Sequence, residues 1–398
     1  MKKLLGIMVL SLLLSGNTYA NHKETEQKFY GNSYEAPGSD KYQKLENQPV
    51  NNDLSKFVDK QLKNNKKTGL VSYILFENDK IIINKKNWNQ DIIENKGLLR
   101  SNSMGKSMVG YVAGHAVCKG YIDNINVMLN DWDVINNTLY ANNTLLQLLN
   151  MTAGDHQIIG EKKYKGDGYV KGDKKKVINN KTVFESMQWF QGTKKKKKKK
   201  SPYNYSAMTT HVIANYVLQK VGIDNYENFL KEIFTNHVGV KDSVYFNKVE
   251  SGVRVKNPIS MWAEGKKWKW VSNYKHGNQR YTFFATAEDY LRISKTIIKD
   301  YKSDSCIGNY LRMIYDNRVK KNNKGYDPKS IGPYSTEYGG QFHMGVKGLK
   351  DRVIFSMDGF GGQQIILDME NNRILIVNST NQHYNWKKLV LNVIKEGK

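Results

Sequence analysis

Runs of β-forming residues stand near both ends of the chain, and helical patterns fill the stretch between them. Near the N-terminus, LVSYILFENDKIIIN (70–84) gives two such runs around a polar turn at 77–80, which predicts a hairpin. Near the C-terminus, three runs follow one another within 352–380, and a final helix is expected over about 385–396. The pattern predicts an α+β fold, with one antiparallel sheet built from both ends and flanked by helices.

Helical periodicity dominates between about 103 and 240, and we expect this largely helical region to be inserted between the two sets of strands. Residues 21–50 are polar and contain turn signals, so an irregular segment is expected to precede a single domain over 51–398. The helices expected in the chain are 51–65, 104–119, 142–151, 207–221 and 225–236.

The first twenty residues have the order of an export signal. Lys2 and Lys3 precede an apolar run over 4–14, and the segment ends in small residues at Ala20. An apolar run of this length is too short to cross a bilayer, so we expect a cleaved signal peptide over 1–20 and no transmembrane anchor in the mature protein. The expected location is therefore the periplasm or the cell exterior.

The chain is strongly basic, with a formal net charge of +25. The run Lys194–Lys200 is expected in an exposed loop, because adjacent ammonium groups cannot be buried together. This run is either a basic rim that attracts anionic substrates or a tolerated insertion. Because the chain is expected to be exported and contains no recognised nucleic-acid-binding motif, no nucleic-acid partner is expected.

Cys118 and Cys306 are the only cysteines, and the sequence leaves open whether they pair. Export permits a disulfide, yet Cys118 stands in an apolar, helix-like run where a buried free thiol is equally ordinary. The 8 histidines show no metal-ligating spacing. We therefore expect no metal and no cofactor.

The stretch SNSMGKSMVG (101–110) contains two motifs with different chemistry. Gly105-Lys106-Ser107 matches the end of a phosphate-binding loop, but the glycine that such a loop needs at position 100 is Arg100. Ser103 and Lys106 instead have Ser-x-x-Lys spacing, which places both side chains on one face at the start of a helix. A lysine there can accept the serine proton, and free N–H groups at the helix start can stabilise an oxyanion. The stretch therefore predicts a serine nucleophile with its base.

Further blocks of sequence give the chain a family resemblance. Together with the Ser-x-x-Lys motif, they resemble the serine β-lactamase-like superfamily, in the branch of class C β-lactamases, related esterases and 6-aminohexanoate-dimer hydrolases. The resemblance covers roughly residues 55–395 and implies a β-lactamase/transpeptidase-like fold. The blocks are TLLQLLNMTAGD (144–155), YNYSAMTTHVIANYV (203–217), FFATAEDYLRIS (283–294) and FSMDGFGGQQIILD (355–368).

The resemblance also implies roles for individual residues. Tyr205 is implied as the partner of Ser103 and Lys106. Two features depart from the family pattern: Ala207 stands where an asparagine is usual, and no Lys-Thr-Gly or His-x-Gly triplet immediately precedes Gly359-Phe360-Gly361. The resemblance implies that the backbone N–H of Phe360 on this glycine-rich strand belongs to the oxyanion hole. It also implies that the substrate lies close to the strand, because glycines leave room for it. The residues implied in these contacts are Gly359, Phe360, Gly361, Gly362 and Gln363.

We therefore expect an exported serine hydrolase that cleaves an ester or amide bond of a small molecule. The acyl-enzyme would form on Ser103, with Lys106 and Tyr205 as general base and acid. The alternatives are a β-lactamase or D,D-peptidase, which the two departures disfavour, and a penicillin-recognising binding module that acylates without turnover. The identity of the substrate stays open.

Overall fold

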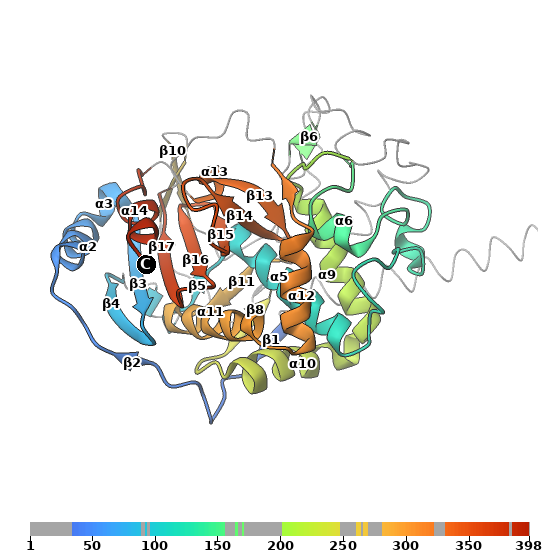
Figure 1. Cartoon of the computed structure of the whole chain (residues 1–398), viewed down its shortest axis with the longest axis horizontal. Helices are drawn as coiled ribbons and strands as arrows, with labels where there is room; N and C mark the ends of the chain where they lie inside the picture. Colours follow the sequence, from blue (N-terminus) through green and yellow to red (C-terminus); the bar gives the residue numbers. More distant parts are fainter. Residues whose placement is uncertain are drawn as a thin grey trace, which may run out of the picture.

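The computed structural model places most of the chain in one α+β arrangement (Figure 1). The expected signal peptide and the Lys194–Lys200 run lie outside the residues that it describes. Within the described part, no helix has both the length and the apolarity needed to cross a bilayer. The described residues are 34–88, 92–93, 96–155, 164–165, 169–170, 201–246, 260–263, 266–269, 281–321, 331–381 and 384–397.

Strands from both ends of the chain form the large sheet, which confirms the predicted fold class. The C-terminal strand β17 pairs antiparallel with the N-terminal strand β3, so red and blue strands lie side by side in Figure 1. Neighbouring strands are antiparallel except β2, which runs parallel to β4. In the described part, the order is β12 (Val319–Lys320), β13 (Ser335–Gly339), β14 (Phe342–Val346), β15 (Ile354–Gly359), β16 (Gln363–Asp368), β17 (Arg373–Ser379), β3 (Leu70–Glu77), β4 (Lys80–Lys86) and β2 (Glu46–Asn47).

The sheet separates two hydrophobic cores. Along β17, Ile374 and Ile376 belong to the core that includes helix α11 (Ala287–Lys302), whereas Leu375 and Val377 belong to the other core. That second core is covered by α2 (Asp53–Lys63) and α14 (Leu391–Glu396). Because successive side chains point to opposite faces, a strand covered on both faces reads as a continuous apolar run. This explains the sequence RILIVNS of β17.

A smaller sheet lies beside the helical region and was not predicted. Its strands have two or three residues each, too few to show an alternating pattern. The segment over 34–50, expected to be irregular, contributes β1 to this sheet and β2 to the large one. The order of the smaller sheet is β1 (Tyr34–Ala36), β8 (Val244–Phe246), β11 (Phe283–Ala285) and β5 (Leu99–Arg100), and two further strand pairs are β6 (Tyr164–Lys165) with β7 (Tyr169–Val170) and β9 (Ser260–Ala263) with β10 (Lys266–Lys269).

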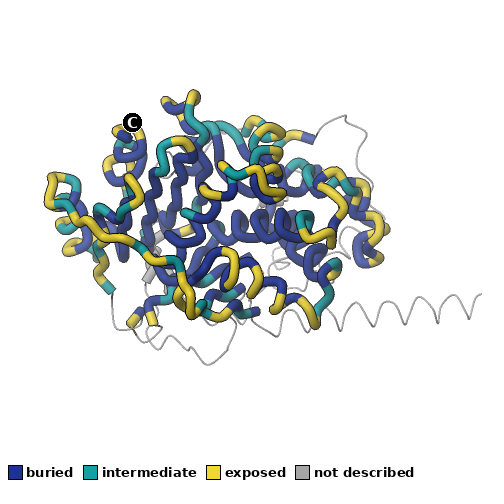
Figure 2. Tube along the Cα trace, turned by 60° about the horizontal axis from the view of Figure 1, so that its bottom comes forward, coloured by how far each residue is buried: buried dark blue, intermediate teal, exposed yellow. Residues whose placement is uncertain are grey.

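The helices predicted in the middle of the chain are present, and the longest two are buried. Nearly every residue of α5 (Gly105–Cys118) and α9 (Ala207–Val221) is buried, which explains why neither helix has one apolar and one charged face. Figure 2 shows this buried interior in dark blue under a partly exposed rim. The remaining helices are α3 (Asn65–Thr68), η1 (Asn102–Met104), η2 (Asp133–Ile135), α6 (Leu145–Leu149), α10 (Ile223–Leu230), the π-helix η5 (Lys231–Val238), α12 (Cys306–Asp316) and α13 (Ile331–Tyr334).

Cys118 and Cys306 form a disulfide that joins the end of α5 to the start of α12. The pair is separated by 188 residues in sequence. We expect the double variant Cys118→Ser/Cys306→Ser to lose about 2–5 kcal/mol of unfolding free energy, because a cross-link over a long loop restricts the unfolded chain. Urea unfolding of the oxidised protein and the double variant measures this difference. Equal midpoints and slopes would contradict the prediction.

Candidate active site

Ser103 and Lys106 meet at the start of α5. Ser103 lies in η1, the short 3-10 turn that leads directly into the helix. The spacing of three residues brings the Lys106 Nζ to 3.0 Å from the Ser103 Oγ, to which it donates a hydrogen bond. Lys106 is only 1% exposed, whereas Ser103 is half-buried and reachable from solvent. The pair has the geometry of a nucleophile beside a proton acceptor.

The glycine and second serine of the motif are explained by packing. A Cβ on Gly105 would lie 1.8 Å from the Tyr281 backbone oxygen, so only glycine fits at this helix start. Ser107 is buried, and its hydroxyl donates to the Gln341 backbone oxygen at 2.7 Å. These contacts account for Gly105 and Ser107 without a phosphate-binding loop.

Tyr205 lies against the same pair. It stands two residues before α9, whose N-cap is Ser206, and its side chain is hydrogen-bonded to that of Ser103. The Lys106 Nζ lies 4.7 Å from the centre of the Tyr205 ring and 3.7 Å from that of Tyr281. The structure therefore brings together the three residues that the sequence singled out, from segments about 100 positions apart.

The surroundings of Tyr205 keep its phenol protonated. Burial raises the pKa of Tyr205 well above its usual range, and the neighbouring Tyr338 and Tyr281 add to the rise. The hydrogen bond with Ser103 opposes the shift only in part. At neutral pH Tyr205 is thus a proton donor, which is the form needed to protonate a leaving group.

A buried carboxylate fixes the segment that carries Tyr205. Asp155, 1% exposed, accepts hydrogen bonds from Ser206 Oγ at 2.6 Å and from Tyr140 OH at 3.1 Å. It ends the block TLLQLLNMTAGD, in which Thr144 and Gln147 form a reciprocal cap at the start of α6. Asp155 therefore positions the residue that follows Tyr205, and through it the phenol.

The glycine-rich turn between β15 and β16 lies next to the nucleophile. A Cβ on Gly359 would lie 2.5 Å from the Ser101 backbone oxygen, so a side chain there would separate the turn from η1. Asn102 Nδ2 donates to the Phe360 backbone oxygen at 2.7 Å, and Gln363 Nε2 lies 3.4 Å from the same oxygen. The φ angle of Asn102 is 48°, a conformation that asparagine tolerates better than most residues.

Not every predicted residue of this turn faces Ser103. Gly361 and Gly362 adopt positive φ angles of 96° and 78°, which glycine allows without strain. A Cβ on Gly362 would lie 2.4 Å from Trp386 Nε1, so this glycine is required by packing against Trp386. Phe360 is 44% exposed and stands at the open edge of the site.

A second lysine and a histidine at the site were missed by the sequence analysis. His343 of β14 stacks on Tyr205 with ring centres 6.3 Å apart, and its Nδ1 lies 3.0 Å from Lys321 Nζ. Burial, followed by the charges of Lys321 and Lys106, holds the pKa of His343 well below its usual range. Lys321 belongs to no local motif. His343 does have a signal that the sequence analysis overlooked, because His343-Met344-Gly345 is itself a His-x-Gly triplet ahead of the glycine-rich strand.

Lys321 gives the site a pH-dependent effect on stability. Burial lowers the pKa of Lys321 to about 7, although the Asp358 carboxylate opposes the shift. Above pH 7 and below its ordinary pKa, the unfolded chain therefore holds a proton on Lys321 that the folded chain has lost. The free energy of unfolding then rises with pH by at most about 1.4 kcal/mol per pH unit from this group.

Lys321→Met removes this contribution. We expect the wild-type protein to gain about 2 kcal/mol relative to the variant between pH 7.5 and 9.5, because the other titrating groups are shared. Urea unfolding of both proteins at the two pH values measures the change. Stability curves that stay parallel across this window would show that Lys321 does not titrate there.

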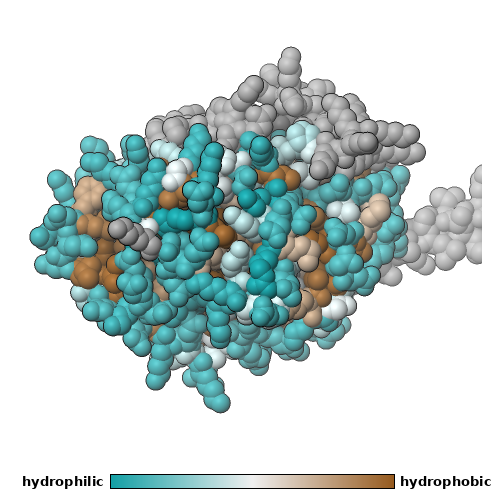
Figure 3. Space-filling view, viewed as in Figure 1, coloured by the Kyte–Doolittle hydropathy of each residue, from teal (hydrophilic) through white to brown (hydrophobic). Residues whose placement is uncertain are grey.

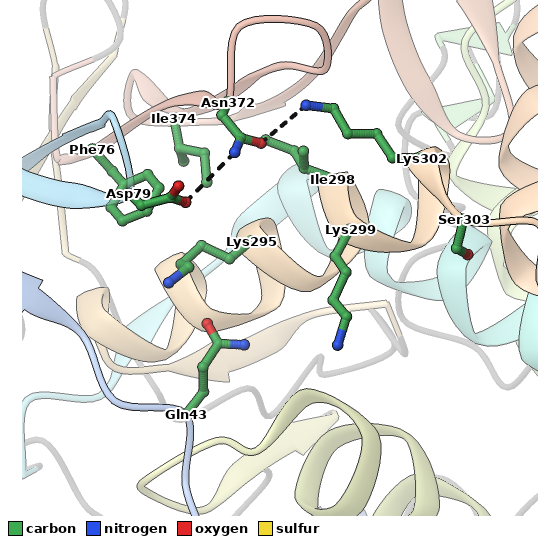
Figure 4. A pocket seen from close by; sticks show the side chains of 10 residues that line it. All are labelled: Gln43, Phe76, Asp79, Lys295, Ile298, Lys299, Lys302, Ser303, Asn372 and Ile374. Atoms are coloured by element: carbon green, nitrogen blue, oxygen red, sulfur yellow. Dashed lines mark hydrogen bonds between the residues drawn. The ribbon is translucent and has the colours of Figure 1, made fainter.

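A cavity of about 470 Å³ lies elsewhere, against α11 (Figure 4). Asp79 and Asn372 line it from the β3–β4 and β16–β17 turns, whereas the glycine-rich turn is at the other end of β16. Its Ser303 hydroxyl is bonded to the Asp300 backbone oxygen and to the Ser305 hydroxyl, not to a lysine. We therefore place the candidate active site at Ser103.

Comparison with known proteins confirms the predicted family and fold class. The family described as Beta-lactamase matches residues 95–393, and no curated protein matches in sequence. A Bacillus anthracis protein provisionally assigned as a 6-aminohexanoate-dimer hydrolase is similar in structure, with a TM-score of 0.61, 13% identity and coverage of 92% of this chain and 91% of that one.

Two further solved structures are similar over most of their length. The D-amino acid amidase from Ochrobactrum anthropi SV3, complexed with L-phenylalanine, gives a TM-score of 0.61 at 16% identity, covering 87% of this chain and 99% of that one. The octameric penicillin-binding protein homologue from Pyrococcus abyssi gives 0.59 at 15% identity, covering 86% and 77%. With the family match over 95–393, this chain belongs to the β-lactamase family.

Proposed function

We propose that the protein is an exported serine hydrolase that cleaves an ester or amide bond through an acyl-enzyme on Ser103. The observation that carries the proposal is the 3.0 Å contact between Lys106 Nζ and Ser103 Oγ, with Tyr205 bonded to the same serine. A serine hydroxyl is a weak nucleophile until a neighbouring group takes its proton. The lysine stands where that group is needed.

In the acylation step, Ser103 Oγ attacks the substrate carbonyl and its proton passes to the Lys106 amine. The Tyr205 phenol gives its proton to the leaving alcohol or amine as the carbonyl–heteroatom bond breaks. The proton held by Lys106 then returns the phenolate to its neutral form. This order follows from the raised pKa of Tyr205, which keeps the phenol protonated at rest, so that Lys106 and not Tyr205 takes the Ser103 proton.

Hydrolysis of the acyl-enzyme uses the same groups in reverse. Water attacks the ester carbonyl, loses a proton to the Tyr205–Lys106 pair, and Ser103 regains its proton as the ester bond breaks. We assign the oxyanion hole to the backbone N–H groups of Ser103 and Phe360. The assignment is supported by the hydrogen bond from Asn102 to the Phe360 carbonyl, which holds the Phe360 backbone beside η1.

The substrate class is a small ester or amide. The named activity of the Ochrobactrum amidase supports an amide, whereas the family match also supports a β-lactam. Ala207, buried at the first position of α9, offers only a methyl group where an asparagine side chain would bind a substrate amide. This favours an esterase or amidase over a β-lactamase or D,D-peptidase.

Export of the protein is supported by two independent features. The segment MKKLLGIMVLSLLLSGNTYA has the composition of a signal peptide, and the Cys118–Cys306 disulfide is typical of oxidising compartments. The proposed location is the periplasm or the exterior.

The proposal is tested by labelling the purified protein with a fluorophosphonate and mapping the adduct by peptide mass. A single adduct on Ser103 is expected, together with turnover of short-chain esters or amides. Rapid turnover of nitrocefin with slow turnover of esters would instead establish the β-lactamase alternative. An adduct with a β-lactam that forms and does not hydrolyse would establish the binding module. Failure of the folded protein to react with any of these reagents would refute acyl transfer at Ser103.

A further inference from the structure

Two histidines and an aspartate meet on the side of α5 that lies away from the candidate active site. They are His115 near the end of α5, His237 of the π-helix η5 and Asp300 near the end of α11. One ligand atom from each residue lies within 4.8 Å of the other two. The three residues come from distant parts of the chain, so no residue spacing in the sequence predicts the cluster.

His115 lacks the partner that a buried imidazole needs. It is 7% exposed, and its Nε2 has no hydrogen-bond partner within the described part of the chain. Its ring meets those of Tyr111 and His237 edge to face, at centre distances of 4.6 and 5.3 Å. A buried nitrogen without a partner is costly unless something else occupies the space that it faces.

The neighbouring groups supply the charge and donors that a cation requires. Asp300, whose side chain is 5% exposed, has both carboxylate oxygens 3.0 Å from His237 Nε2. Tyr111 OH donates to Asp300 Oδ2 at 2.5 Å, which orients the carboxylate as outer-shell donors do at metal centres.

We propose that His115, His237 and Asp300 form a binding site for a divalent transition-metal ion such as Zn²⁺. Two imidazoles with one carboxylate are a common zinc ligand set, and water would complete the coordination. Ligand atoms held about 2.0–2.2 Å from one tetrahedral metal ion lie roughly 3.4 Å apart. The His237–Asp300 separation of 3.0 Å is already close enough, so only the wider separations in the cluster, at most 4.8 Å, must shorten. His237 is 39% exposed at its side chain and lies on a π-helix, a form often found at functional sites, so it has room to move.

A metal ion bound there would stabilise the fold and would take no part in the hydrolytic reaction. His115 follows Lys106 by nine residues on α5, a distance of about 14 Å along the helix axis. A metal there would join α5 to η5 and α11, three residues from the Cys118 end of the disulfide. Two cross-links would then hold the far end of the helix that carries the nucleophile.

The test uses the purified protein without a histidine tag, stripped with a chelator and dialysed against micromolar Zn²⁺. We expect one zinc per chain by elemental analysis, a rise in Tm of several degrees, and visible absorption of a low-coordinate complex with Co²⁺. His237→Gln should weaken zinc binding about 100-fold or more, because even outer-shell changes cost 10–100-fold. His211→Gln is the matched control, since it removes another histidine and leaves the three ligands in place.

The outcomes separate clearly. Zinc bound equally by His237→Gln and the wild type, or no binding by the folded wild type at micromolar Zn²⁺, overturns the proposal. His237 is exposed, so its variant is expected to fold; circular dichroism checks this. If it does not fold, protection of the exposed His237 from diethyl pyrocarbonate by Zn²⁺ decides the question on the wild type. An unprotected His237 then counts against the site.

Discussion

Ser103→Ala is expected to reduce kcat/KM by roughly 10⁴-fold or more for any substrate that the protein hydrolyses, because the acyl-enzyme can no longer form. The side chain is half-buried and its loss leaves the helix start intact, so the variant should fold as the wild type does. Steady-state hydrolysis of a short-chain ester or amide measures the loss, and fluorophosphonate labelling at this position should disappear with it.

Ser107→Ala is the matched control, because it removes the other serine of the same stretch. Its hydroxyl donates to the Gln341 backbone oxygen, and losing one buried hydrogen bond costs about 1 kcal/mol of stability. We expect kcat/KM to stay within about tenfold of the wild type. Equal losses in the two variants would show that Ser103 supports the fold rather than the reaction. A Ser103→Ala protein with wild-type turnover would exclude the acyl-enzyme altogether.

Tyr205→Phe is expected to lower kcat by about 10²–10⁴-fold, because the leaving group loses its proton donor. The ring stays in place, so its contacts with Lys106 and His343 are kept and KM should change little. Substrates whose leaving groups need no proton, such as activated phenyl esters, should lose much less than unactivated esters or amides. Comparing the two classes of substrate isolates proton donation from positioning.

Tyr203→Phe provides the control for that comparison. Tyr203 packs against Tyr338, as Tyr205 does, and lies two residues before it. We expect its replacement to reduce kcat by less than about tenfold on either class of substrate. A loss in Tyr205→Phe that is the same for activated and unactivated substrates would remove the tyrosine from the proton path.

The central part of the fold could be predicted because its strands carry continuous or alternating apolar patterns. The β3–β4 hairpin and the strands β15 to β17 were placed within a few residues from periodicity and turn residues alone. The C-terminal helix was expected from about 385, but it begins at Leu391. The smaller sheet could not be predicted, because strands of two or three residues carry no period.

The candidate active site likewise has residues that the sequence could predict and residues that it could not. Ser103 and Lys106 were identifiable because one helical turn joins them, and Tyr205 because the family resemblance covers its segment. His343, Lys321 and Asp155 act through neighbours that only the folded chain brings near. Asp155 and His343 are buried, whereas the face of the molecule in Figure 3 is mostly hydrophilic.

The pairing of β3 with β17 has a consequence for how the chain acquires its structure. Ile374 lies opposite Phe76, so the middle of the large sheet stays open until the last strands of the chain have left the ribosome. Contacts so distant in sequence form late and slowly. Until then β3 presents an unpaired apolar edge, and the nascent chain cannot reach its final shape. Such a polypeptide stays incompletely folded throughout its synthesis. Truncation before Arg373 would remove β17, the strand whose side chains pack into both hydrophobic cores.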